Sequence, residues 1–256
     1  MTIEFRRHRL RGLPVSAAAV LFLAPFLPLV SQVPDPGEYL EEPVMAMDDF
    51  EPGDSGIHIV FHGHSVPTGY YTGGRVQPFQ AYPYMVWEKL SANFPDAEIQ
   101  VVTTSIGGEN AERGAERFSE DVLVQRPDVL LIDYALNDRA IGLERAEAGW
   151  RSMIEAALEA DIRVLLLTPT PDTREDPHDP GTPLASHSNQ IRELAAEYKV
   201  GLVDCYAAFA KRLEADPDLS LGELMVQANH PNEAGHRIAA ETILPWFKLP
   251  SRTEGE

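Results

Sequence analysis

The fold of this chain is decided by residues 57–69, where the run Ile57-His58-Ile59-Val60-Phe61 is followed by Gly63-His64-Ser65-Val66-Pro67-Thr68-Gly69. The first run is apolar apart from His58, which predicts a short buried strand. The second contains the glycine, proline and serine that are typical of a turn. Open α/β sheets bind ligands at the carboxyl ends of their strands, so Ser65 is a candidate nucleophile. A turn serine that bonds its own backbone is the alternative.

Predicted strands and helices alternate from Ile57 onward. We expect further strands at 99–103, 129–134, 163–168 and 200–203, and helices at 82–94, 111–125, 143–160, 184–198, 206–214 and 233–247. The third strand is an unbroken apolar run apart from Asp133, as in sheets that are covered on both faces. Alternation of this kind predicts a parallel sheet with right-handed crossovers. The fold class is therefore α/β, a three-layer α/β/α sandwich with a five-stranded parallel sheet.

Length and composition indicate one globular domain. The chain has 256 residues, 44% of them hydrophobic and 24% charged, which is ordinary for a folded protein. Its formal net charge is −19, and such a surface repels phosphate backbones. We therefore expect no nucleic acid partner, and neutral or cationic substrates suit the surface better. Solubility alone is an equally good explanation of the acidity.

Residues 1–31 resemble a targeting segment. Four arginines lie between Arg6 and Arg11, and an apolar stretch runs from Leu13 to Val30. We expect a signal peptide and an exported protein, periplasmic or secreted. An uncleaved N-terminal anchor is the alternative, and we expect membrane contact only if this segment is retained. Residues 32–56 are rich in proline, glycine and acids, which predicts a linker or an arm lying over the domain. The single Cys205 excludes an internal disulfide.

Three later segments place polar or glycine residues where predicted strands end or the last helix begins. Gly107 and Gly108 follow the second strand, where their backbone N–H groups can point outward. Asn137 follows the third strand and can donate its amide to a developing oxyanion; an Asx turn or helix cap is the alternative. His230 directly precedes the last helix, in the order His230-Pro231-Asn232.

The order of these pieces resembles the SGNH (GDSL) hydrolase family over about residues 57–247, within a domain that we place at 57–250. The resemblance implies a flavodoxin-like SGNH hydrolase fold and a serine ester hydrolase. It implies that Ser65 is the nucleophile and His230 the general base. The backbone N–H groups of Ser65 and Gly108, with the side chain of Asn137, would form the oxyanion hole. This chemistry requires no metal and no other cofactor.

Two positions depart from the family pattern. The first block usually reads Gly-Asp-Ser, and here it is Gly63-His64-Ser65. A literal Gly53-Asp54-Ser55 precedes the first strand, lacks the strand-turn-helix context, and is interpreted as linker. The family's acid lies three residues before the histidine, where this chain has Gln227. Gln227 can orient His230 but cannot stabilise an imidazolium with a full charge. A Ser-His dyad, a displaced carboxylate such as Glu223, and an inactive protein remain open.

We expect a small acyl ester as substrate, with an O-acetyl group on a carbohydrate first. A lysophospholipase or thioesterase is the alternative within the fold, and a non-catalytic carbohydrate-binding relative is the alternative outside enzymes. Tyr70, Tyr71 and Tyr82 can stack on a sugar ring or belong to the core.

The remaining polar groups favour structural roles. His62 and His64 have a spacing that permits a metal between them, but a strand-end polar network is favoured because no partner ligand set is evident. The loop at 169–183, with Asp172, Asp176, His178 and Asp179, is expected to be a solvated acidic loop that overhangs the site.

Overall fold

A five-stranded parallel sheet forms the centre of the computed structural model, which describes residues 33–249. Its strands are β1 (Ile57–Gly63), β2 (Ile99–Thr103), β3 (Val129–Asp133), β4 (Arg163–Leu167) and β5 (Gly201–Val203). They lie in the order β2-β1-β3-β4-β5, and every pairing is parallel. This is the flavodoxin-like order, in which β1 and β3 flank the point where the winding of the chain reverses. The predicted fold class is confirmed.

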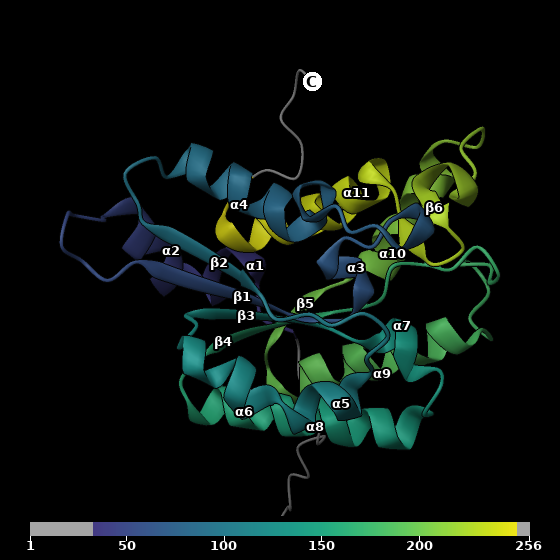
Figure 1. Cartoon of the computed structure of the whole chain (residues 1–256), viewed down its shortest axis with the longest axis horizontal. Helices are drawn as coiled ribbons and strands as arrows, with labels where there is room; N and C mark the ends of the chain where they lie inside the picture. Colours follow the sequence, from purple (N-terminus) through teal and green to yellow (C-terminus); the bar gives the residue numbers. More distant parts are fainter. Residues whose placement is uncertain (1–32, 250–256) are drawn as a thin grey trace, which may run out of the picture. The chain divides into compact units, whose positions relative to one another are not determined.

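Helices cover both faces of the sheet (Figure 1). One layer contains α5 (Ala111–Glu116), α6 (Phe118–Asp121), α8 (Leu143–Glu159) and α9 (Pro183–Tyr198). The other contains α4 (Tyr82–Asn93), α10 (Cys205–Ala215) and α11 (Glu233–Ile243). Two one-turn helices, α3 (Ser65–Thr68) and α7 (Ala135–Asp138), follow β1 and β3. A small antiparallel hairpin, β6 (Met225–Gln227) with β7 (His230–Pro231), precedes α11.

Alternating side chains along the strands divide the core between the two faces. Ile59 and Phe61 of β1 belong to the cluster under α4 and α11, whereas Val60 belongs to the cluster under α8 and α9. All three are essentially inaccessible to solvent. Both faces are apolar because both are covered, which explains the hydrophobic runs at 129–132 in β3 and 164–167 in β4.

Two predicted helices are shorter than their sequence patterns suggest. The segment 111–125 is divided into α5, α6 and a 3₁₀ turn at Leu123–Gln125. The break falls at Arg117, whose guanidinium bonds Glu109 and Asp121 on either side of it. The last helix ends at Ile243 and continues as a 3₁₀ turn, Leu244–Phe247, because Pro245 cannot donate to the preceding turn.

The segment interpreted as a linker or arm packs into the domain. It forms α1 (Pro36–Tyr39) and α2 (Glu41–Asp48), and Leu40, Val44 and Met47 are buried in the cluster under α4 and α11. The predicted targeting segment 1–31 lies outside the described residues. No helix within residues 33–249 is long and apolar enough to cross a membrane.

Leu40→Ala is expected to lower the free energy of unfolding by about 2–4 kcal/mol, because it removes a fully buried side chain from the core. Met45→Ala is the matched control, since Met45 lies five residues further on and is 52% exposed. Urea denaturation of both variants measures the difference. Equal stabilities would show that the segment contributes no core packing.

Candidate active site

Ser65 and His230 meet at the carboxyl end of the sheet. Ser65 is the first residue of α3, directly beyond β1, and its Oγ lies 2.8 Å from Nε2 of His230. His230 is half-buried on β7, immediately before α11. The residues are 165 positions apart, so the fold rather than local sequence makes this contact. A hydroxyl bonded to an imidazole is the arrangement that nucleophilic catalysis requires.

The groups predicted to donate to an oxyanion lie on the connections after three neighbouring strands, β2, β1 and β3. Ser65 is at the first position of a helix, where no helical turn can use its N–H group. Gly108 has a φ of +83°, and its backbone N–H makes no hydrogen bond within the described part of the chain. The amide of Asn137 donates to the Glu109 carbonyl at 2.8 Å, which uses one of its two N–H bonds. The sequence-predicted donors therefore come from the loops after β1, β2 and β3.

The other side of His230 lacks the predicted partner. Gln227 faces His230 across the β6–β7 hairpin, but its amide donates to the Tyr71 carbonyl at 3.2 Å. Nδ1 of His230 is buried and has no hydrogen-bond partner among the described residues. Glu223, the other suggested acid, bonds Ser220 and closes a capping box at its own turn. Neither side chain orients His230.

The surroundings of His230 favour its neutral form. Burial lowers the pKa of His230, and the neighbouring His64 imidazole lowers it further. The Asp172 carboxylate opposes both effects, but the net pKa lies below the usual histidine range. A neutral imidazole is the state that accepts a proton from serine.

Asp172 belongs to a buried ion-pair cluster rather than to a solvated loop. Its side chain is inaccessible to solvent and bonds Arg139 at 2.9 Å and Arg174 at 2.5 Å. Burial alone raises the pKa of Asp172, but the bonds from Arg174 and Arg139 outweigh it and hold the pKa at about 2. Arg139 also pairs with Glu175. The expectation of a solvated acidic loop is wrong at Asp172, because the sequence pattern did not reveal that Arg139, on the turn after α7, reaches this loop.

The loop after β4 is also tied to the loop that carries His230. The N–H of Thr173 donates to the carbonyl of Ala228 at 2.7 Å. Asp176 and Asp179 accept bonds from the backbone of their own turns, at His178 and Gly181. The loop is therefore bonded to the turn between β6 and β7, two residues before His230.

Comparison with known proteins now places the chain in a family. A model of the GDSL-like lipase/acylhydrolase family matches residues 61–238, which include both Ser65 and His230. The chain belongs to the GDSL-like lipase/acylhydrolase family. It is a serine ester hydrolase.

This chain is similar in sequence to a known esterase and similar in fold to two solved esterase structures. An acetylxylan esterase from Geobacillus stearothermophilus is 26% identical over 167 residues, covering 60% of this chain and 75% of the relative. The crystal structure of Axe2, an acetylxylan esterase from the same organism, superposes with a TM-score of 0.67 at 24% identity and covers 78% of this chain and 98% of its own. A two-domain esterase active on acetylated mannans gives a TM-score of 0.68 at 20% identity, covering 85% of this chain and 55% of its own.

His64, which replaces the family's usual aspartate, lies in a buried polar network. Its Nδ1 accepts a bond from the Val66 N–H at 3.2 Å and caps α3. Its Nε2 lies 3.3 Å from Oδ1 of Asp133, whose other oxygen accepts a bond from the Tyr82 hydroxyl at 3.0 Å. The strand-end polar network expected for His64 is therefore present, but its partners Asp133 and Tyr82 were not predicted, although the acid at the end of an apolar strand was a signal. Gly63 is required here because a Cβ would lie 2.4 Å from the Asp133 carbonyl oxygen.

His62 and His64 contact different protein groups. His62 bonds Thr104, the Gly114 carbonyl and the Tyr134 hydroxyl, and burial lowers its pKa to about 4. Within residues 33–249 no group of three or more histidine, cysteine or acidic side chains has the geometry to hold a metal ion.

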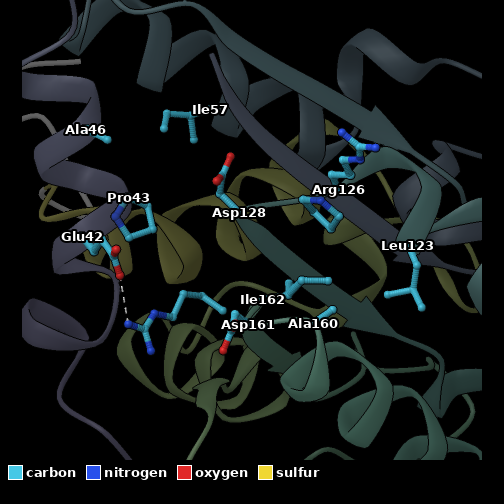
Figure 2. Close-up of a pocket in the computed structure, with 12 residues that line it drawn as sticks. Glu42, Pro43, Ala46, Ile57, Leu123, Arg126, Asp128, Ala160, Asp161 and Ile162 are labelled. Carbon is cyan, nitrogen blue, oxygen red and sulfur yellow. Dashed lines mark hydrogen bonds and ion pairs between the residues drawn. The ribbon is translucent and has the colours of Figure 1, made fainter. Parts of the chain in front are cut away.

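A cavity of about 450 Å³ lies at the opposite end of the sheet (Figure 2). Ile57, Asp128 and Ile162 lie beside the starts of β1, β3 and β4, and Glu42 of α2 pairs with Arg163 at its edge. Its lining contains no member of the Ser65–His230 site. Open α/β sheets bind their ligands at the carboxyl ends of the strands, and this cavity lies at the amino ends.

His64→Asp restores the family's usual Gly-Asp-Ser but is expected to destabilise this protein. The new carboxylate would face the buried Asp133, so one of the two must take up a proton in the folded state. The unfolded chain releases that proton, and the free energy of unfolding therefore falls as the pH rises above about 4.

His64→Asn is the control, since asparagine keeps the helix cap without a charge. Urea denaturation at pH 4.5 and pH 8 measures both variants. The aspartate variant should be the less stable of the two at pH 8, with a smaller gap at pH 4.5. A gap that does not change with pH would contradict the role given to Asp133.

Proposed function

We propose that this protein removes acetyl groups from a carbohydrate ester, with Ser65 as nucleophile and His230 as general base. The observation that carries the proposal is the 2.8 Å contact between Oγ of Ser65 and Nε2 of His230. The acetyl and carbohydrate specificity rests on the relatives, which include acetylxylan esterases and an esterase active on acetylated mannans.

In the proposed reaction, Ser65 attacks the ester carbonyl as its proton moves to Nε2 of His230. The electron pair of the carbonyl bond moves to the oxygen, which accepts hydrogen bonds from the N–H groups of Ser65 and Gly108 and from Asn137. Each such donor contributes about 3–4 kcal/mol to transition-state stabilisation. The leaving alkoxide takes the proton from His230, and water, activated by His230, then releases the acid.

Within residues 33–249 no acid bonds Nδ1 of His230, and this sets the expected rate. Replacing the aspartate of a serine-protease triad with a neutral amide costs about 10⁴ in kcat when the geometry is kept. The oxyanion donors act independently of that carboxylate, so a slower but measurable serine-dependent rate is expected without it.

Ser65→Ala is expected to lower kcat for p-nitrophenyl acetate by at least about 10³, because it removes the nucleophile. The wild-type protein should hydrolyse acetyl esters faster than octanoyl esters and release acetate from acetylated xylan or mannan. Stopped spectrophotometric assays and acetate quantification measure these rates. Equal rates for both proteins would indicate a carbohydrate-binding relative, and a preference for octanoate would indicate a lipase-type enzyme.

Gln227→Asp is expected to raise kcat by about tenfold or more, because a carboxylate at this position can pair with Nδ1 of His230 and stabilise the imidazolium. In the wild type, kcat/KM should rise with pH through a value below 6.5 and then stay level, since the lowered pKa of His230 marks loss of its proton. In the variant the carboxylate raises that pKa, so the acid limb should move to higher pH.

Gln227→Asn is the matched control, with the same side-chain length as aspartate and no charge. A pH–rate profile of all three proteins makes the comparison. An unchanged acid limb in Gln227→Asp would mean that the new carboxylate does not reach His230.

A further inference from the structure

Tyr70 lies beside His230 but has no role in the proposed Ser65–His230 reaction. Its ring stacks on the His230 ring, with centroids 6.2 Å apart and an interplanar angle of 26°. Offset stacks of aromatic rings occur at centroid separations of about 4.5–7 Å. The N–H of Tyr70 donates to the carbonyl of Ser65 at 3.1 Å, so the same residue is fixed to the nucleophile's turn.

Gly107 makes room for the Tyr70 ring. A Cβ on Gly107 would lie 2.6 Å from both Cζ and the hydroxyl oxygen of Tyr70. No real Cβ tolerates that distance, so any larger residue at 107 must displace the ring. The ring is thus held between the backbone after β2 and the imidazole of His230.

His230 needs such support because its other restraints are weak. Nδ1 is buried without a hydrogen-bond partner among the described residues, and Gln227 turns toward Tyr71. In a serine-protease triad the carboxylate at this nitrogen holds the imidazole in its orientation and stabilises its charged form. The face of a tyrosine ring can do part of both tasks, since it restricts the ring plane and attracts a cation.

We propose that Tyr70 is a positioning residue that holds the His230 ring at Ser65 in place of the carboxylate that residue 227 does not supply. The Tyr70 ring has room for this contact because residue 107 is a glycine. The proposal rests on the proposed Ser65–His230 reaction. It assigns Tyr70 to the histidine rather than to the sugar, the role that its aromatic character first suggested. Tyr70 acts through His230 and takes no proton itself.

Tyr70→Leu should lower kcat for p-nitrophenyl acetate by about tenfold with little change in KM, and Tyr70→Phe should restore the wild-type kcat. Tyr71→Leu is the control, because Tyr71 is the adjacent tyrosine and contacts Gln227 only through its backbone carbonyl. A Tyr70→Leu effect confined to KM would overturn the proposal in favour of sugar stacking. A Tyr70→Phe variant as slow as Tyr70→Leu would also overturn it.

Gly107→Ala tests the same contact from the other side. It should lower kcat in the wild-type background, and its effect should be markedly smaller in the Tyr70→Leu background, where no ring remains to be displaced. Fully additive effects would overturn the proposed contact. Urea denaturation of each variant identifies a loss of rate that arises from unfolding.

The Ser65→Ala rate separates this proposal from the proposed function. If wild type and Ser65→Ala hydrolyse the ester equally, the proposed function fails. The contact between Tyr70 and His230 is then tested by NMR spectroscopy, without an activity assay. The ¹⁵N and ¹H resonances of the His230 ring should broaden in Tyr70→Leu and stay sharp in Tyr70→Phe. If Ser65 is required but Tyr70→Leu is as active as wild type, only the positioning role fails.

Discussion

The hydrogen bond between Ser65 and His230 is the contact on which the arrangement of this site depends, and it exists because of strand order. β1 lies between β2 and β3, so the turn that carries Ser65 is flanked by the loops that carry Gly108 and Asn137. His230 reaches the same edge from a hairpin that the loop after β4 supports through the Thr173–Ala228 bond. A different order of the same strands would leave these residues apart. The parallel sheet therefore does more than form a core: it gathers groups from four connections at one point.

The sequence predicted the elements well because periodicity reports burial. β3 and β4 are largely apolar on both faces, and helices of suitable length separate the strands, so the parallel α/β class followed directly. Its failures occur where particular side-chain contacts, rather than periodicity, decide the local structure. The helix predicted over 111–125 breaks at Arg117, and residues 36–48 pack as helices because Leu40 and Val44 find a place in the core. Neither outcome is visible in a local pattern.

The site was predictable in its composition but not in its electrostatics. The resemblance to the family, rather than position alone, named Ser65, Gly108, Asn137 and His230, and the structure brings Ser65 and His230 into contact. The partners of charged groups were not predicted, because a pairing such as Asp172 with Arg139 joins loops 33 residues apart. Sequence reasoning could state that Gln227 is neutral. It could not show that the Gln227 amide bonds Tyr71 and leaves Nδ1 of His230 buried without a partner. The Tyr70 ring was noticed as an aromatic residue, and only the fold assigns it a neighbour.

The two departures from the family pattern have different physical consequences. At position 64 an imidazole stands where the family usually has a carboxylate. A carboxylate is nevertheless nearby, because Oδ1 of Asp133 lies 3.3 Å from Nε2 of His64, and the Tyr82 hydroxyl donates to the other oxygen of Asp133. The site therefore keeps a carboxylate beside position 64, but it comes from the end of β3 instead of from residue 64. At position 227 nothing comparable occurs, since the nearby Asp172 already pairs with two arginines and its charge is largely neutralised. A carboxylate so compensated cannot stabilise an imidazolium strongly. Among the described residues, His230 is therefore held by its bond to Ser65 and by the Tyr70 ring that stacks against it.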